Sequence, residues 1–428
     1  MHKNIIFTLF LITVSSPVWA QPSQGISATS GLSFDELARL ALTRNKALQA
    51  ARESLRQTQA RLVQAQVWPN PSIDLSKKSD ALFANDGDTG YAVTLAQPVE
   101  LGGKRSKRAR VAELSIAVAQ ADMADSERQL IGRLRLLYEE TAGAAARIDL
   151  FERLEQVNNQ MISTMNVRLR AGDASQLDSR LLQAQTNQVR AEQLMAQNQL
   201  TAAVLQIRTL AGLSLDEPLL MRRPLVLADA PETEDVVLTR ALQNRPDLKA
   251  ARLREELAQA GITLAKSQAV PDATAFLRYG QDSIPVLATG STRRLFEREK
   301  SVEVGVSIPL PLFNREQGNI AEATSRRLQV RAERENLEAT VRQEVVSAFR
   351  RYDTAHKTVE ILQTGVLQQN QESFRIVQLA YNLGDLRLLD IVNQQRVLID
   401  AETTSVNAQT ELGSARAELA RVVGDAVP

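Results

Sequence analysis

Hydrophobic and polar residues alternate in four short segments of the chain. In the last of them, Val302, Val304 and Val306 alternate with Glu303 and Gly305. A period of two indicates a β-strand with one apolar and one polar face. The same alternation predicts strands at about 72–78, 91–97, 273–280 and 302–308. Such apolar faces either pack against helices or face lipid, and the strand pattern alone does not choose between these environments.

A long helical stretch follows each pair of strands. Two stretches of about 67 residues, 104–170 and 316–382, contain no proline, and a helix of that length is a rod of about 100 Å. Their apolar positions form a narrow stripe, which is typical of helices with coiled-coil neighbours. Because a glycine-aspartate turn and a returning helix follow each rod, the pattern predicts two long helical hairpins, 104–212 and 316–424.

The two halves of the chain repeat one another. Residues 41–71 match residues 241–271 at ten positions without a gap. A period this long indicates a duplicated half-protein rather than a solenoid. The expected first repeat, 21–232, contains a helix at 33–66, the first strand pair, the hairpin 104–212 and a connecting segment 213–232. The expected second repeat, 233–428, contains a helix at 235–268, the second strand pair and the hairpin 316–424.

The first 20 residues have the features of a secretory signal peptide. Lys3 precedes an apolar run, and Val18-Trp19-Ala20 forms an acceptable cleavage site. An uncleaved anchor helix is the alternative. With no cysteine in the sequence, an N-terminal lipid anchor and disulfides are excluded. No apolar stretch after residue 20 approaches the roughly 20 residues of a transmembrane helix, so a chain in a membrane would cross it as strands.

Composition agrees with helices packed side by side. Aromatic residues make up only 4% of the chain, and 51 Lys and Arg against 50 Asp and Glu leave a net charge of +1, which gives no bias toward nucleic acid. His356 is the only histidine after residue 20, and no catalytic constellation is recognisable. We therefore expect no enzyme, cofactor or bound metal. Four strands cannot close a barrel, but twelve strands from three copies can, and the six hairpins would then form a continuous tube.

Two segments that follow the second and fourth strands carry a family resemblance. They are Gln97-Pro98-Val99-Glu100-Leu101-Gly102-Gly103-Lys104-Arg105 and Pro309-Leu310-Pro311-Leu312-Phe313-Asn314-Arg315-Glu316-Gln317-Gly318-Asn319-Ile320-Ala321. With the duplicated plan, the chain resembles the TolC-like outer-membrane efflux factors, and these junctions resemble their cobalt–zinc–cadmium (CzcC-type) branch. The resemblance implies a mainly α fold with transmembrane β: a homotrimer with a 12-stranded barrel in outer-membrane lipid, continuous with an α-helical barrel in the periplasm. It also implies two partners, a periplasmic adaptor and a resistance–nodulation–division (RND) pump of the inner membrane.

The resemblance also assigns residues at the hairpin turns. Asp390 matches an aspartate that forms the pore constriction, and Asn393 stands where the family has a second aspartate. Tyr381 and Asp178 match members of a gate, whereas the gate arginine is replaced by Leu386, with Arg387 beside it. The turn glycines are Gly172 and Gly384. The alternative for Asp390 is an ordinary exposed carboxylate at a helix start.

A basic cluster follows the second strand, at Lys104, Arg105, Lys107 and Arg108. Cations at a helix start oppose the helix dipole, so we expect them to face lipid phosphates; a solvated helix face is the alternative. The sequence thus favours a passive outer-membrane exit duct for heavy-metal cations in a tripartite RND system, gated at the periplasmic tip. Drug efflux or type I protein secretion by the same fold is one alternative, and a soluble periplasmic coiled-coil scaffold or adaptor is another.

Overall fold

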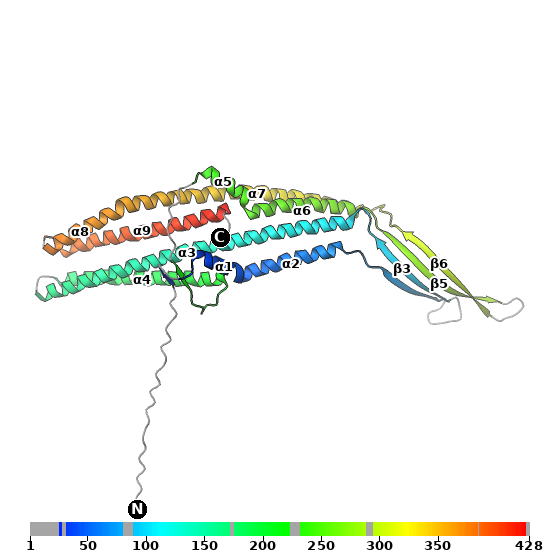
Figure 1. The fold of residues 1–428 in the computed structure, drawn as a ribbon, viewed down its shortest axis with the longest axis horizontal. Helices are drawn as coiled ribbons and strands as arrows, with labels where there is room; N and C mark the ends of the chain where they lie inside the picture. Colours follow the sequence, from blue (N-terminus) through cyan, green and yellow to red (C-terminus); the bar gives the residue numbers. More distant parts are fainter. Residues whose placement is uncertain are drawn as a thin grey trace, which may run out of the picture.

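The computed structural model describes residues 25–27, 31–79, 89–171, 175–222, 232–287, 294–383 and 385–424. The expected signal peptide and the turn glycines Gly172 and Gly384 lie outside these residues. Long helices run side by side along the molecule, with the sheet at one end and the hairpin turns at the other (Figure 1). Within the described ranges, no helix combines the length and the apolar character needed to cross a membrane.

Both halves of the chain share one plan: two short helices, two strands and a long helical hairpin. The first half contains β1 (Gly25–Ser27), α1 (Phe34–Arg44), α2 (Lys46–Gln66), β2 (Ser72–Ser79), β3 (Thr89–Val99), α3 (Lys104–Ala171), α4 (Gln176–Ala211) and β4 (Leu220–Arg222). The second half contains α5 (Glu234–Asn244), α6 (Pro246–Gln268), β5 (Ala273–Leu287), β6 (Arg294–Ser307), α7 (Gln317–Ile361), the π-helix η1 (Leu362–Leu367), α8 (Gln368–Leu383) and α9 (Leu388–Val423).

The single helix predicted at 33–66 is two helices, because the chain breaks at Asn45. Its backbone is extended (φ −60°, ψ 125°), and its side chain accepts a hydrogen bond from the backbone N–H of Leu48 at the start of α2. The helix predicted at 235–268 breaks in the same way at Arg245. There the cause is Pro246, since the residue before a proline is disfavoured in the helical region.

Four antiparallel strands form the sheet, in the order β2-β3-β5-β6. The helices that lead into and out of these strands contact one another in the matching order α2-α3-α6-α7. The sheet and this helical layer therefore share two edges, one at β2 and α2 and the other at β6 and α7. The strand ladder of β5 and β6 continues beyond the predicted ends, to Leu287 and from Arg294, because main-chain pairing does not require apolar side chains.

Cross-strand pairing brings the predicted apolar positions together on one face. Leu75 lies opposite Val93, Val93 opposite Tyr279, and Tyr279 opposite Val302. A second row of the same kind consists of Ile73, Leu95, Leu277 and Val304. All eight side chains are exposed in the single chain. Within one chain, this face is not covered by helices.

A small core near the middle of the molecule joins the helices to a sheet that the sequence did not predict. Strands β1 and β4 pair in parallel, and Met221 of β4 is completely buried with Leu37, Leu134 and Ile207. Strand β4 lies in the segment expected to be a plain connection, 213–232. Three-residue strands carry too few alternating positions to be recognised from sequence.

The second rod also departs from its prediction. The chain from 316 to 382 was expected to be one continuous helix, but residues Leu362–Leu367 form a π-helix between α7 and α8. The segment contains Gly365, around which an added side chain would have open space. A π-helix inserts a residue into the helical repeat and changes which side chains face the neighbouring helix. The direction of the apolar stripe therefore changes between α7 and α8.

Candidate functional site

Two aspartates predicted at the tip begin the returning helices. Asp390 Oδ2 accepts a hydrogen bond of 3.0 Å from the backbone N–H of Arg387. Asp178 Oδ2 accepts one of 3.4 Å from the backbone N–H of Ser175. Each aspartate is the third residue of its helix, where a carboxylate both satisfies a free N–H group and complements the helix dipole. In both halves, an aspartate at the equivalent position thus caps the helix that follows the turn.

Asn393 lies one turn after Asp390 on α9 and is exposed, as Asp390 is. Residues three apart on a helix share a face, so the two predicted constriction residues present an amide and a carboxylate side by side. Neither side chain packs into the buried tip cluster of Met165, Ile391 and Val392. The exposed edge of α9 can therefore meet water, an ion or another chain.

The gate that the resemblance assigns to Tyr381, Arg387 and Asp178 stays a prediction. Within the described residues, no hydrogen bond or ion pair joins either side chain to that carboxylate. The Tyr381 ring lies under the guanidinium of Arg168 instead, 4.7 Å from its centre. Arg168 belongs to α3 and was not among the predicted site residues. It lies three residues after Met165, on the face of α3 that packs on Tyr381, and this spacing was the available signal. This cation–π contact connects the two hairpins close to their turns.

A buried amide pair joins the hairpins further from the tip. Gln395 Nε2 of α9 donates to Asn158 Oδ1 of α3 at 2.6 Å. The two residues are 1% and 0% exposed, and Asn158 Nδ2 and Gln395 Oε1 have no protein partner. Sequence reasoning missed them because isolated amides occur throughout these helices. Unsatisfied buried polar atoms are costly, so this contact between α3 and α9 is less stable than an apolar one.

The basic cluster lies where β3 becomes α3, and its charges are engaged within the chain. Lys104 Nζ donates to Asp272 Oδ1 at 2.8 Å, and the same oxygen accepts from the backbone N–H of Leu101. The Arg108 guanidinium makes two hydrogen bonds to the Glu100 carboxylate. These contacts bind the start of α3 to the linkers on both sides of it. They explain why cations are tolerated at this helix start, since carboxylates offset their effect on the dipole.

Arg105 and Lys107 complete the cluster. The Arg105 guanidinium lies 4.2 Å from the centre of the Trp68 ring, and Lys107 Nζ donates to the carbonyl of Gly102 at 2.8 Å. Neither side chain is paired with a carboxylate in these contacts, so both keep a net positive charge. Of the four predicted cations, these two remain candidates for lipid phosphates.

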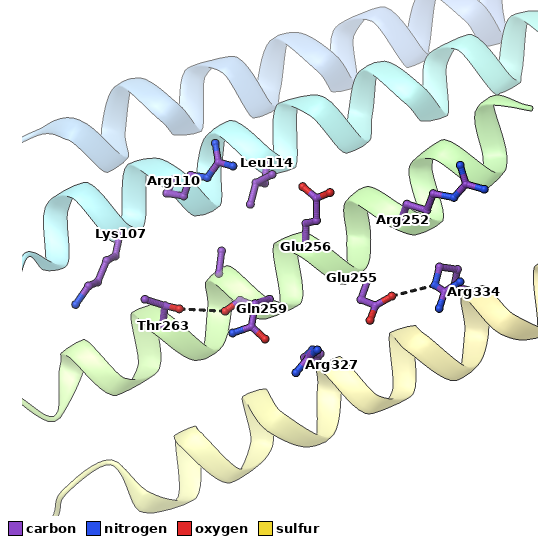
Figure 2. Close-up of a pocket in the computed structure, with 11 residues that line it drawn as sticks. Lys107, Arg110, Leu114, Arg252, Glu255, Glu256, Gln259, Thr263, Arg327 and Arg334 are labelled. Carbon is purple, nitrogen blue, oxygen red and sulfur yellow. Dashed lines mark hydrogen bonds and ion pairs between the residues drawn. The ribbon is translucent and has the colours of Figure 1, made fainter. Parts of the chain in front are cut away.

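A charged groove of about 730 Å³ lies between α3, α6 and α7. Figure 2 shows Glu255 reaching from α6 to Arg334 of α7, and their hydrogen bond is 2.9 Å long. Lys107 and Arg110 line the opposite wall, on α3. Across the ranges described, no group of three or more His, Cys, Asp and Glu residues could hold a metal ion. Most of the side chains that line the groove are charged, whereas a small-molecule pocket is lined mainly by hydrophobic and aromatic side chains.

Comparison with known proteins gives these features a common context. The profile of the family described as outer membrane efflux protein matches residues 37–213 and 237–425. The cobalt-zinc-cadmium resistance protein CzcC of Cupriavidus metallidurans is 24% identical over 401 residues, covering 93% of this chain and 91% of CzcC. The nickel and cobalt resistance protein CnrC of the same organism is 26% identical over 80% of this chain and 79% of its own length.

Solved structures are similar over the same length. The outer-membrane channel OprN has a TM-score of 0.75 at 19% identity, with 92% of this chain and 90% of OprN covered. The outer membrane protein VceC of Vibrio cholerae has a TM-score of 0.73 at 20% identity, with 92% and 97% covered. The predicted TolC-like fold is confirmed, and both the fold and the family are those of channels rather than enzymes. Since the family profile covers most of both halves, the chain belongs to the outer membrane efflux protein family.

Proposed function

We propose that this protein is the outer-membrane exit duct of a tripartite RND system that exports heavy-metal cations. One observation carries the proposal: an exposed apolar face spans all four strands, and the strands lead into long hairpins (Figure 1), in which α3 alone has 68 residues, a length of about 100 Å. Water is a poor solvent for such a face, whereas lipid is a good one. Membership of an outer-membrane family sets aside the alternative of a soluble periplasmic scaffold.

Three copies are the assembly that this sheet supports. Strands β2 and β6 are its outer strands, and unpaired strand edges are not tolerated in lipid. Successive strands run in opposite directions, so β6 of one copy followed by β2 of the next preserves the antiparallel alternation. Twelve strands then close without an edge, and six helical hairpins continue the wall into the periplasm. The conduit is passive, and its tip is gated where Asp390 and Asn393 begin α9.

The partners that this proposal requires are a periplasmic adaptor and an inner-membrane RND pump. Three curated relatives are named for resistance to cobalt, nickel, zinc or cadmium, which supports metal cations as the cargo. The duct itself is poor in soft ligands, with no cysteine and with His356 as the only histidine beyond residue 20. Selection among metals therefore belongs to the pump and the adaptor.

Metal tolerance of a deletion strain tests the proposal. Growth is measured across Co, Zn, Cd, Ni, Cu and Ag, with the intact gene restored on a plasmid as the control. We expect tolerance of at least one of these metals to fall and to recover with the plasmid. The competing function is export of organic molecules, because pyoverdine export protein OpmQ of Pseudomonas aeruginosa is also 23% identical over 91% of this chain. Unchanged metal tolerance with lost tolerance of drugs would favour that function.

A further inference from the structure

An exposed apolar segment follows β6 at one edge of the molecule. Its sequence from residue 308 to 313 is Ile-Pro-Leu-Pro-Leu-Phe. Leu310 is 75% exposed, Leu312 64% and Phe313 91%. Isolated apolar side chains on a surface need no explanation, but a contiguous exposed run marks a contact surface. In the single chain nothing covers these side chains.

A groove lies at the same level on the opposite edge. It has a volume of about 710 Å³ and is formed by the linker between α2 and β2, residues 67–71, with Pro98 and Val99 of β3. The Gln97 side-chain amide donates to the carbonyl of Pro69 at 3.0 Å, and this contact fixes the position of the linker. Trp68 and two prolines give the groove rigid apolar walls. Its volume exceeds that of one aromatic side chain.

The inside of the chain shows how two such linkers fit together. Where β3 pairs with β5, the linker after β3 packs against the linker before β5. The backbone N–H of Leu101 donates to Asp272 at 3.0 Å, and a Cβ added to Gly102 would lie 3.1 Å from the Cβ of Val270. The residue at position 102 therefore lies directly against the residue at position 270.

Because the two halves repeat one another, the residues equivalent to this contact lie at the two outer edges of the chain. Counted forward from Pro98 and its counterpart Pro309, Gly102 corresponds to Phe313; the linker then continues for two more residues before α7 than before α3. Counted back from Pro271 and its counterpart Pro71, Val270 corresponds to Asn70. Asn70 belongs to the groove, and Phe313 to the exposed segment. A glycine packed tightly inside the chain thus corresponds to a large exposed phenylalanine, and its partner position corresponds to an open groove.

We propose that Phe313 of one copy inserts into the groove formed by residues 67–71 of the next copy. This contact continues the pairing of β6 with β2 of the next copy that the proposed function requires. The inference therefore rests on the proposed trimer. The contact closes the ring where strands become helices, beyond the end of the strand ladder. An aromatic ring buries about 150–250 Å², so three such contacts add an apolar belt between the strand-edge part of the interface, which consists of main-chain hydrogen bonds, and the helical part. The occupant is a second copy of this chain.

Cysteine cross-linking tests this contact directly, because the natural chain contains no cysteine. The double variant Phe313→Cys, Asn70→Cys is expressed at full length and its outer membranes are oxidised with copper phenanthroline. Adjacent positions form a disulfide only when their Cα atoms lie within about 7 Å. We expect the monomer band to shift to linked dimers and a linked trimer on non-reducing gels. Each single variant should remain a monomer.

The matched control is Leu328→Cys, Asn70→Cys. Leu328 is also exposed, at 62%. It lies on the same edge of the molecule, on α7, about 17 Å from the start of that helix. It should give no linked species. A native trimer in which the Phe313→Cys, Asn70→Cys pair stays unlinked would overturn the inference and leave the trimer intact, with Phe313 facing lipid or solvent. A chain that is monomeric in detergent would overturn both proposals.

Discussion

The guanidinium of Arg245 donates to the backbone carbonyl of Val422 at 3.1 Å, from the break between α5 and α6 to the last turn of α9. The first repeat contains the counterpart: the side-chain amide of Asn45 donates to the carbonyl of Leu210 at 2.8 Å. In both halves, the residue that breaks the short helix pair also satisfies a free carbonyl at the end of the returning helix. In each half, this side chain adds a polar anchor for the hairpin to the apolar core at the middle of the molecule.

Replacement of Arg245 should destabilise the folded chain strongly. Arg245 is 4% exposed and also pairs with Asp247 at 2.6 Å and with Glu344 at 2.8 Å. Arg245→Ala leaves the partly buried Asp247 carboxylate without its main partner, and breaking a buried pair costs about 3–5 kcal/mol. We expect a clear fall in the thermal midpoint of the helical circular dichroism signal of the purified protein in detergent.

The matched control is Arg375→Ala. Arg375 pairs with Glu372 on the surface of α8, where both side chains are more than half exposed. Surface pairs contribute little to stability, so its midpoint should match that of the natural protein. Equal midpoints for the Arg245 and Arg375 variants would show that the Arg245 network does not stabilise the chain.

Acid should weaken the same network. Burial opposes ionisation of Asp247, but hydrogen bonds from Arg245 outweigh burial and hold the pKa of Asp247 below its ordinary value of 3.8. A carboxyl with a lowered folded-state pKa contributes stability that is complete above about pH 4 and lost as the pH falls through that pKa. We expect the Asp247→Asn variant to be less stable at pH 7, and the stability difference to shrink as the pH falls through the lowered pKa of Asp247. A stability difference that is constant with pH would contradict this assignment.

The sequence was sufficient to predict the long helices and the apolar faces of the strands, because both depend on a periodic pattern over many residues. Val302, Val304 and Val306 needed only their alternation to be placed on one face. The breaks at Asn45 and Arg245 were missed because the helical pattern continues on both sides of them. Pro246 was the available signal, since it disfavours helix at Arg245. The pairing of β1 with β4 joins three residues to three others almost 200 positions away, and no local pattern reports it.

The sequence predicted that Asp178 and Asp390 stand near the starts of the returning helices, but it did not predict the contacts of the side chains around them. The repeat located Asp178 and Asp390 at equivalent helix starts, and the structure gives both the same helix-capping hydrogen bond. The partner of Tyr381 could not be predicted, because the choice of Arg168 over Asp178 depends on how α3 and α8 pack. The basic cluster was read as a surface feature. Asp272, which neutralises Lys104, is 168 residues away in the sequence.

A positive charge on the apolar strand face should prevent membrane assembly. Val304 lies opposite Leu277 in the sheet and is 78% exposed in the single chain. An arginine facing lipid near the middle of a bilayer costs about 2–4 kcal/mol per strand position, and a trimer carries three. We expect Val304→Arg to abolish recovery of the protein in outer-membrane fractions, measured by immunoblot after sucrose-gradient separation.

The neighbouring position supplies the control. Glu303 belongs to the opposite face of β6, where it lies across from Arg278. Glu303→Arg replaces this exposed ion pair by two like charges, which costs little at a solvated site, so the variant should reach the outer membrane. If Val304→Arg assembles as well as Glu303→Arg, the apolar face does not meet lipid. If both variants fail, arginine at either face blocks assembly and the lipid-facing assignment of Val304 is contradicted.

The buried amide pair should respond differently to single and double replacement. Asn158→Leu alone leaves Gln395 buried without a partner, which costs about 1–3 kcal/mol. The double variant Asn158→Leu, Gln395→Leu removes both polar groups and should recover most of that loss. Thermal unfolding of the natural, single and double variants completes a double-mutant cycle. Strictly additive effects would show that the two amides do not depend on each other.

Removal of the Asp390 charge should weaken cation block of the channel. Three symmetry-related carboxylates near the axis would attract cations, but Asp390 also caps α9 through the N–H of Arg387. Asp390→Asn removes the charge and keeps an oxygen that can accept this hydrogen bond, whereas Asp390→Ala removes both. In planar-bilayer recordings, we expect block by Co²⁺ added on the periplasmic side to weaken in both variants. Asp178→Asn, which alters the equivalent cap of α4, is the control and should keep the natural block. If Co²⁺ blocks the Asp390→Asn channel as strongly as the natural channel, Asp390 caps its helix but does not line the conduction path.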